Sequence, residues 1–291
     1  MRVTLLGTGC PIVDPDRFGP ATLVWTDRST ILVDCGSGVT QRLLAAGSSG
    51  RDIDALLLTH LHSDHLVDLY QLIISSWHQG RDRPQRVFGP PGTKAYVDGL
   101  MALWMKEREG RIAHEQRTDT SAFDIEVEEI ADGQVLELGD MVVKTVEVNH
   151  KPVPCAFGFV FEGDGGKAVI SGDTAYCPEL IAAAADADLL VHEVYIHRGF
   201  PEISGLRTPR GMSNVASYHT LSSDVGKVAT ESRAACLMLT HFVPTRFDEE
   251  DLLAEVRESY AGPLIIGEDL MTFDIAGRSL RLGDALLAFG S

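Results

Sequence analysis

Four metal-capable side chains occupy six consecutive positions of the sequence: His60, His62, Asp64 and His65. They come directly after the apolar run 55–58. Because a buried strand cannot hold so many polar groups, we expect the chain to leave a sheet here and gather the imidazoles in one small volume. Imidazole and carboxylate together suit Zn²⁺, Mn²⁺ or Fe²⁺, and a ligand set without cysteine is more often catalytic than structural. The alternative is a polar loop whose histidines face solvent.

Three more candidate ligands follow predicted strands further along the chain. His150 comes after the run 142–148, Asp173 after 168–171 and His241 after 236–240. Loops at strand ends often carry functional residues, although a polar residue at a strand end is also common without such a role. With the first cluster they make five histidines and two aspartates, which is enough for two adjacent metal ions.

Short apolar segments and glycine-rich turns must position these side chains. Strand patterns occur at 4–6, 21–25, 31–34, 53–59, 127–130, 135–138, 141–148, 157–162, 168–171, 189–192, 236–240, 264–266 and 271–275. Helical patterns cover 41–46, most of 66–115, 178–185, 222–232 and 249–258. No linker or low-complexity tract divides the chain. We therefore predict a single α/β domain over residues 1–291, an αββα sandwich of two mixed β-sheets flanked by helices, with a helical insert at about 66–115.

The composition is that of a globular protein with an acidic surface. The 291 residues are 44% hydrophobic and carry a formal net charge of −17. Such a surface repels polyanions and disfavours nucleic acid as a partner without excluding it. No run approaches 18 consecutive apolar residues, so no membrane partner is expected. The five cysteines are scattered, and together with the absence of a signal-peptide pattern they predict reduced thiols in a cytoplasmic protein.

The pattern of motifs resembles the metallo-β-lactamase superfamily of binuclear metallohydrolases. The resemblance covers nearly the whole chain, from Gly7-Thr8-Gly9 through the HxHxDH run at 60–65 to Thr240-His241. Within the superfamily the chain is most similar to the ribonuclease Z and arylsulfatase-like branch. The motifs that carry this likeness are the opening segment 5–9, Ser171-Gly172-Asp173-Thr174, the run 190–193 and His219-Thr220.

The resemblance implies roles for residues at matching positions. One metal ion would be held by His60, His62 and His150; the other by Asp64, His65 and His241; Asp173 would bridge the two. It implies two divalent ions, with Zn²⁺ expected and Mn²⁺ or Fe²⁺ as alternatives, and a metal-bridging hydroxide as the nucleophile.

The resemblance also implies a catalytic group of three residues, Asp64, His219 and Glu193. His219 corresponds to a family histidine that contacts the scissile group, and Glu193 would orient His219 or a ligand imidazole. The alternative for Glu193 is an ordinary carboxylate at a strand end.

Two segments have roles that the sequence leaves open. The polar stretch 197–218 is predicted to be a lid over the site, with Arg198, Arg207 and Arg210 available to an anionic substrate. The alternative is a surface loop. Trp and Met residues in the helical insert fit a packing face or a homodimer contact.

The substrate class follows from a departure from the family pattern. Ribonuclease Z proteins hold tRNA with a basic arm between the third-motif histidine and the Gly-Asp-Thr motif, yet only 22 residues separate His150 from Asp173 here. We therefore expect hydrolysis of small anionic esters, either phosphodiesters or sulfate esters. The alternatives are a tRNA 3′-processing endonuclease of the ribonuclease Z type and a lactone or β-lactam hydrolase.

Overall fold

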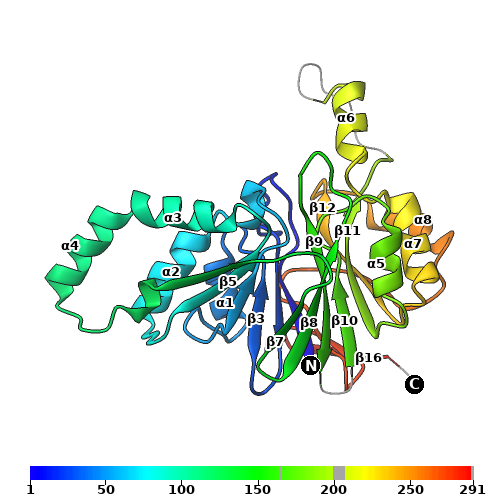
Figure 1. Ribbon diagram of the computed structural model, residues 1–291. Helices are drawn as coiled ribbons and strands as arrows, with labels where there is room; N and C mark the ends of the chain where they lie inside the picture. The colour runs from blue at the N-terminus through cyan, green and yellow to red at the C-terminus, as the bar shows by residue number, and fades with distance from the viewer. Residues whose placement is uncertain (164–165, 199–206, 290–291) are drawn as a thin grey trace.

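The computed structural model describes residues 1–163, 166–198 and 207–289. Two β-sheets lie face to face, and helices cover the outer face of each (Figure 1). The structure therefore confirms the predicted αββα sandwich of two mixed sheets. Among the described residues, no helix is both long and apolar enough to cross a membrane.

The first sheet has nine strands in the order β16-β15-β14-β1-β2-β3-β4-β5-β6. The strands from β3 to β6 run parallel, whereas the other neighbouring pairs are antiparallel. The bounds are β1 (Arg2–Gly7), β2 (Ala21–Trp25), β3 (Thr30–Val33), β4 (Ala55–Leu57), β5 (Gln85–Gly89), β6 (Ile125–Glu129), β14 (Thr272–Asp274), β15 (Ser279–Leu282) and β16 (Ala285–Ala288).

The second sheet has seven strands in the order β13-β12-β11-β10-β9-β8-β7. Strands β10 to β13 are parallel, and β7 to β10 form an antiparallel meander. The bounds are β7 (Val135–Leu138), β8 (Met141–Glu147), β9 (Phe157–Gly163), β10 (Gly166–Ile170), β11 (Leu189–Tyr195), β12 (Leu237–Val243) and β13 (Leu264–Ile266). Strands β9 and β10 pair antiparallel, and residues 164–165 between them lie outside the described residues.

Three apolar layers hold the sandwich together. The central layer fills the space between the sheets and includes Leu57, Phe159 and Val191. The other two layers lie between each sheet and its helices. The helices are α1 (Val39–Ala45), α2 (Leu69–His78), α3 (Thr93–Leu103) and α4 (Met105–Glu115) on the side of the first sheet, and α5 (Pro178–Ala183), α7 (Ser222–Glu231) and α8 (Glu249–Arg257) on the side of the second.

Helices α4 and α6 (Pro209–Ala216) extend away from this body (Figure 1). The predicted insert contains α2, α3 and α4 with β5 between them; α4 has no buried residue, and Trp104 stacks on Tyr70 with ring centroids 4.8 Å apart. The predicted lid at 197–218 contains the protruding helix α6, and its residues 199–206 lie outside the described residues. The lid and the homodimer contact both stay predictions.

Candidate metal centre

The loop after β4 supplies the first group of candidate ligands. The chain leaves the sheet at Leu57, and Ser63–His65 form a single turn of 3₁₀ helix, which breaks the alternation of an extended strand. His60 and His65 are buried, and His62 is partly exposed. This is the turn into one volume that the sequence predicts for residues 60–65.

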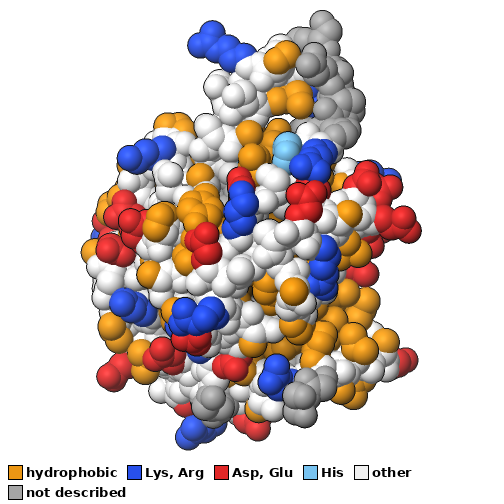
Figure 2. All heavy atoms as spheres, turned by 90° about the vertical axis from the view of Figure 1, so that its right-hand side faces the viewer, with side chains coloured by type: hydrophobic (Ala, Val, Ile, Leu, Met, Phe, Trp, Pro, Cys, Tyr) orange, Lys and Arg blue, Asp and Glu red, His pale blue; other side chains and the backbone are white. Residues whose placement is uncertain are grey.

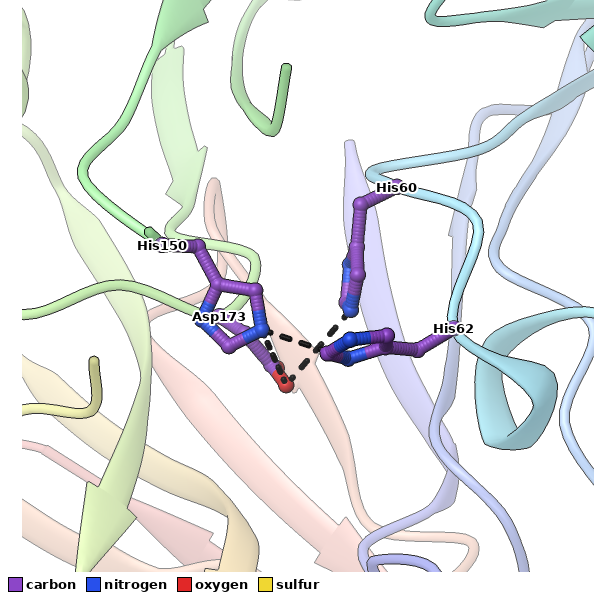
Figure 3. A group of neighbouring side chains, drawn as sticks. All are labelled: His60, His62, His150 and Asp173. Atoms are coloured by element: carbon purple, nitrogen blue, oxygen red, sulfur yellow. Dashed lines mark hydrogen bonds and ion pairs between the residues drawn. The ribbon is translucent and has the colours of Figure 1, made fainter. Parts of the chain in front are cut away.

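The other ligands come from three strands of the second sheet or the residues just after them, and they face this loop. His150 follows β8, Asp173 follows β10, and His241 lies within β12, where the backbone has φ 44°. Figure 3 shows His60, His62, His150 and Asp173 pointing toward one another from the two sheets. The structure thus brings together all seven residues for which the sequence predicts a metal-binding role.

The donor atoms form two adjacent groups. In the first group, His150 Nε2 lies 3.3 Å from His62 Nδ1 and 3.9 Å from Asp173 Oδ2. In the second group, Asp64 Oδ2 lies 3.4 Å from His241 Nε2 and 3.5 Å from His65 Nε2. Asp173 Oδ2 is also 3.3 Å from the same two histidine nitrogens, so it stands between the groups.

The donor set fits metal ions. The Nε2 atoms of His60 and His65 are buried and make no hydrogen bond to any described residue, although both point into the cluster. A buried polar atom without a partner is costly, and a bound cation would satisfy it. The cluster could therefore bind metal, and its mixture of imidazole and carboxylate suits Zn²⁺, Mn²⁺ or Fe²⁺.

The outward nitrogens of three candidate ligands are held by neighbouring groups. His65 Nδ1 lies 2.8 Å from Asp34 Oδ2, His60 Nδ1 lies 3.0 Å from Thr59 Oγ1, and His150 Nδ1 lies 2.8 Å from a backbone carbonyl, that of Tyr218. Such partners fix the tautomer and the orientation of a metal-binding imidazole.

Burial and charge favour the ligand forms of His60 and Asp173, whereas His65 is shifted the other way: burial opposes its charge, but Asp173 and Asp34 outweigh burial and raise the pKa of His65 well above its ordinary value. Burial and the neighbouring His65 hold the pKa of His60 well below its ordinary value, so this imidazole is neutral. Burial would raise the pKa of Asp173, but His241 and His65 outweigh burial and hold that pKa well below its ordinary value. Neutral imidazole and ionised carboxylate are the forms that bind a cation.

A second pair of residues lies beside the cluster. Glu193, on β11, is buried, and its Oε1 accepts hydrogen bonds from the Thr174 and Thr220 amides and from His219 Nδ1, the last at 3.0 Å. Burial opposes charge on His219, but the Glu193 carboxylate more than offsets it and raises the pKa of His219 to about 9. The ring centroid of His219 is 5.2 Å from that of His150, so a protonated imidazole borders the candidate metal centre.

Several supporting residues were not predicted to have a role, because their contribution has no side-chain signature in the sequence. Tyr218 uses its backbone carbonyl, Thr174 and Thr220 use backbone amides, and Thr59 is an ordinary strand-end hydroxyl. The adjacency of Tyr218 to His219 is the one signal that could have drawn attention to it.

Comparisons with known proteins agree with this geometry. The family model described as anti-Pycsar protein Apyc1 matches residues 1–204. A ribonuclease Z of Mycobacterium marinum is 37% identical over 287 residues, covering 96% of this chain and 100% of its own, and a ribonuclease Z of Mycolicibacterium gilvum is 38% identical over 275 residues, covering 93% and 94%.

Solved structures show the same fold. The metallo-β-lactamase-fold protein YhfI from Bacillus subtilis superimposes with a TM-score of 0.74 at 20% identity, covering 94% of this chain and 99% of that one. The short form of human tRNase Z gives a TM-score of 0.69 at 23% identity, with coverage of 94% and 99%. The chain therefore belongs to the anti-Pycsar Apyc1 family and to the wider ribonuclease Z group of metallo-β-lactamase-fold hydrolases.

Proposed function

We propose that the protein is a metal-dependent phosphodiesterase of the ribonuclease Z type, which cleaves a phosphodiester bond near the 3′ end of an RNA precursor. The observation that carries the proposal is the clustering of seven imidazole and carboxylate donors beside the His219–Glu193 pair. The comparisons favour RNA over the small ester that the sequence first suggested, because near full-length relatives at 35–38% identity are ribonuclease Z proteins.

The proposed ligands divide between two ions. His60, His62 and His150 would hold one; Asp64, His65 and His241 would hold the other; Asp173 would contact both. When bound, divalent ions activate water as the nucleophile and neutralise charge on the phosphoryl oxygens. A cavity of about 360 Å³ beside Asp64, lined also by Ser63 and Val67, gives a substrate access to this place.

The leaving oxygen needs a proton, and His219 is placed to supply it. With a pKa raised to about 9, its imidazole is protonated at neutral pH. Glu193 accepts a hydrogen bond from the Nδ1–H group of His219, so the proton on Nε2 stays available for transfer to the leaving oxygen. After the transfer, the neutral imidazole keeps its Nδ1 proton and its orientation. The pair is therefore a general acid and its positioning carboxylate.

This chain has no room for an RNA-binding arm between His150 and Asp173, and a relative of nearly the same length has little more. Strands β9 and β10 fill the interval between His150 and Asp173. The alignment with the Mycobacterium marinum protein spans 287 positions and 96% of this chain, so insertions in that relative amount to only a few residues. RNA binding without such an arm is therefore part of the proposal.

A second candidate is a phosphodiester or sulfate ester of small size. It is favoured by the net charge of −17 and by the surface, where basic and acidic side chains are interspersed on the face shown in Figure 2. Interspersed charges bind a polyanion less strongly than a continuous basic stripe does. The small ester therefore belongs in the same assay as RNA.

The test pairs metal content with substrate choice. The purified protein is loaded with Zn²⁺ or Mn²⁺ and given a tRNA precursor with a 3′ trailer, bis(4-nitrophenyl) phosphate and an aryl sulfate. We expect about two ions per chain and endonucleolytic cleavage of the precursor. Turnover of the small ester with an intact precursor would replace the proposal with the second candidate. Cleavage of neither, at full metal loading, would refute both.

A matched pair of variants guards the assay against contaminating nucleases. His62→Ala removes a proposed ligand that is already partly exposed, so it should fold and lose activity. His114→Ala changes an exposed histidine on α4, outside the cluster, and should keep activity. Equal cleavage by the two variants would mean that the activity does not belong to this site.

A further inference from the structure

His241 is the exception among the candidate histidine ligands. His60, His65 and His150 each have a protein group on the outward nitrogen, and His62 is partly exposed, so solvent can reach it. His241 is 3% exposed, and its Nδ1 is buried without a hydrogen-bond partner among the described residues. Its Nε2 faces Asp64 and Asp173, so Nδ1 is the atom that points away from the proposed metal ion.

Glu193 also has a buried polar atom without a hydrogen-bond partner among the described residues. Its Oε1 accepts three hydrogen bonds, from two backbone amides and from His219. Its Oε2 is also buried and accepts none from the described part of the chain. A carboxylate that is 1% exposed should not leave one oxygen without a donor, because the unsatisfied atom costs free energy.

Both residues line the same small cavity. It lies between the sheets, has a volume of about 30 Å³, and its walls include Asp34, Ser171 and Thr240 as well as Glu193 and His241. Glu193 and Thr240 are direct neighbours on the parallel strands β11 and β12, and His241 is the next residue. A buried water needs a polar site of roughly 10–15 Å³ or more and two to four polar partners, and this cavity meets both conditions.

We propose that this cavity binds one water molecule, which accepts a hydrogen bond from His241 Nδ1 and donates one to Glu193 Oε2. The donor and acceptor roles are fixed by chemistry: an imidazole that binds metal through Nε2 carries its proton on Nδ1, and an ionised carboxylate can only accept. The water therefore satisfies both orphaned atoms at once.

The consequence is a link between two parts of the site. Glu193 holds the proton donor His219 through Oε1 and orients the ligand His241 through the water at Oε2. Glu193 is thus a positioning residue for the metal centre as well as for the general acid. This inference rests on the metal site of the proposed function but not on its substrate, so its test needs no RNA.

The first experiment is a crystal structure of the Zn²⁺-loaded protein at a resolution that shows ordered water. The expected result is one density peak within hydrogen-bond distance of both His241 Nδ1 and Glu193 Oε2. An empty cavity, or a protein group on His241 Nδ1, would overturn the proposal. Because the wild-type protein decides this point, no variant has to fold for it.

A matched pair of variants tests the positioning role. Val33→Ile adds a carbon to the cavity wall and should displace the water, whereas Val24→Ile adds the same carbon to the same apolar layer away from the cavity. We expect Val33→Ile to weaken Zn²⁺ binding by about 10-fold or more in competition with a chelator, as loss of an outer partner does, while Val24→Ile matches the wild type. Loss of the water with equal Zn²⁺ affinity in the two variants would show that the water does not position His241.

Discussion

The two sheets contribute to the site in different ways. The first sheet delivers four candidate ligands on one short loop, residues 60–65, directly after β4. The second sheet delivers His150 and Asp173 just after β8 and β10, His241 from within β12, and also Glu193 from β11. A compact loop can form its half of the site locally. The dispersed half exists only once β8, β10, β11 and β12 are in register.

The sharpest test of the comparison is Asp173→Ala, which changes a single residue of the dispersed half. Because Asp173 lies between both donor groups, its loss should reduce hydrolysis by more than about 100-fold, the upper effect of losing an outer partner. Metal content by mass spectrometry should fall while the circular dichroism spectrum is kept. The exposed Asp98→Ala is the control. Retained turnover in a metal-depleted Asp173 variant would refute the assigned site.

His219→Ala separates proton donation from metal binding within the dispersed half. General acid catalysis contributes about 10²–10⁴-fold, so kcat on the tRNA precursor should fall by that factor at unchanged metal content. An ester with a 4-nitrophenol leaving group needs less help from an acid and should be affected less. An equal loss on both substrates would contradict the role of general acid.

Asp34→Asn probes the compact half through the partner of His65. The carboxylate lies 2.8 Å from His65 Nδ1, and Asp34 has φ 61°, a conformation that asparagine also tolerates. Metal affinity should weaken by about 10–100-fold, because the imidazole loses a charged partner. Competition with a chelator measures this. An affinity equal to the wild type would mean that the loop is held by other contacts.

The pH profile tests the link between Glu193 and His219. With the pKa of His219 raised to about 9, the acid is protonated at neutral pH, and kcat/KM should fall as pH rises through about 9. Glu193→Gln removes the carboxylate that raises this pKa, so the alkaline limb should move toward lower pH. A limb that stays in place would assign it to a different group.

The smallest effect is expected from α6, which lies outside both halves. If the segment 197–218 acts as a lid, Arg210→Ala should raise KM for the RNA precursor by about a few-fold, since one phosphate contact is lost. Turnover of the small ester should not change. Arg233→Ala, at an exposed ion pair with Asp186, is the control. Identical KM values for the two variants would remove Arg210 from the substrate-binding surface.

The ligand set and the two-sheet sandwich could be predicted from the sequence, whereas the exact strand bounds and the substrate preference could not. The metal-binding role of the loop 60–65 could be predicted because its ligands are adjacent in the sequence, and the sandwich could be predicted from the alternation of strand and helix patterns. The predicted strand at 53–59 was longer than the observed β4, Ala55–Leu57, because the chain leaves the sheet before the ligands begin. The preference for a small ester rested on net charge and a missing arm, and the ribonuclease Z relatives of similar length favour the alternative.

The supporting contacts could not be predicted for a physical reason. Tyr218 acts through a carbonyl, and Thr174 and Thr220 act through amides, groups that every residue possesses. Nothing in the sequence distinguishes Asp34 from Asp68, and the structure separates them: Asp34 contacts His65, whereas Asp68 accepts hydrogen bonds from Thr40 at the start of α1. Which carboxylate meets which imidazole depends on tertiary placement.

The spread of the proposed ligands over the chain has a consequence for the lifetime of the protein. Each proposed ion takes ligands from both sheets, one from His60 and His150 and the other from His65 and His241, so each would act as a cross-link that the unfolded chain lacks. An ion present at 1,000 times its dissociation constant adds about 4 kcal/mol to the free energy of unfolding. Scarcity of metal would then expose the chain to proteases, and the amount of protein in a cell would follow the supply of its ion.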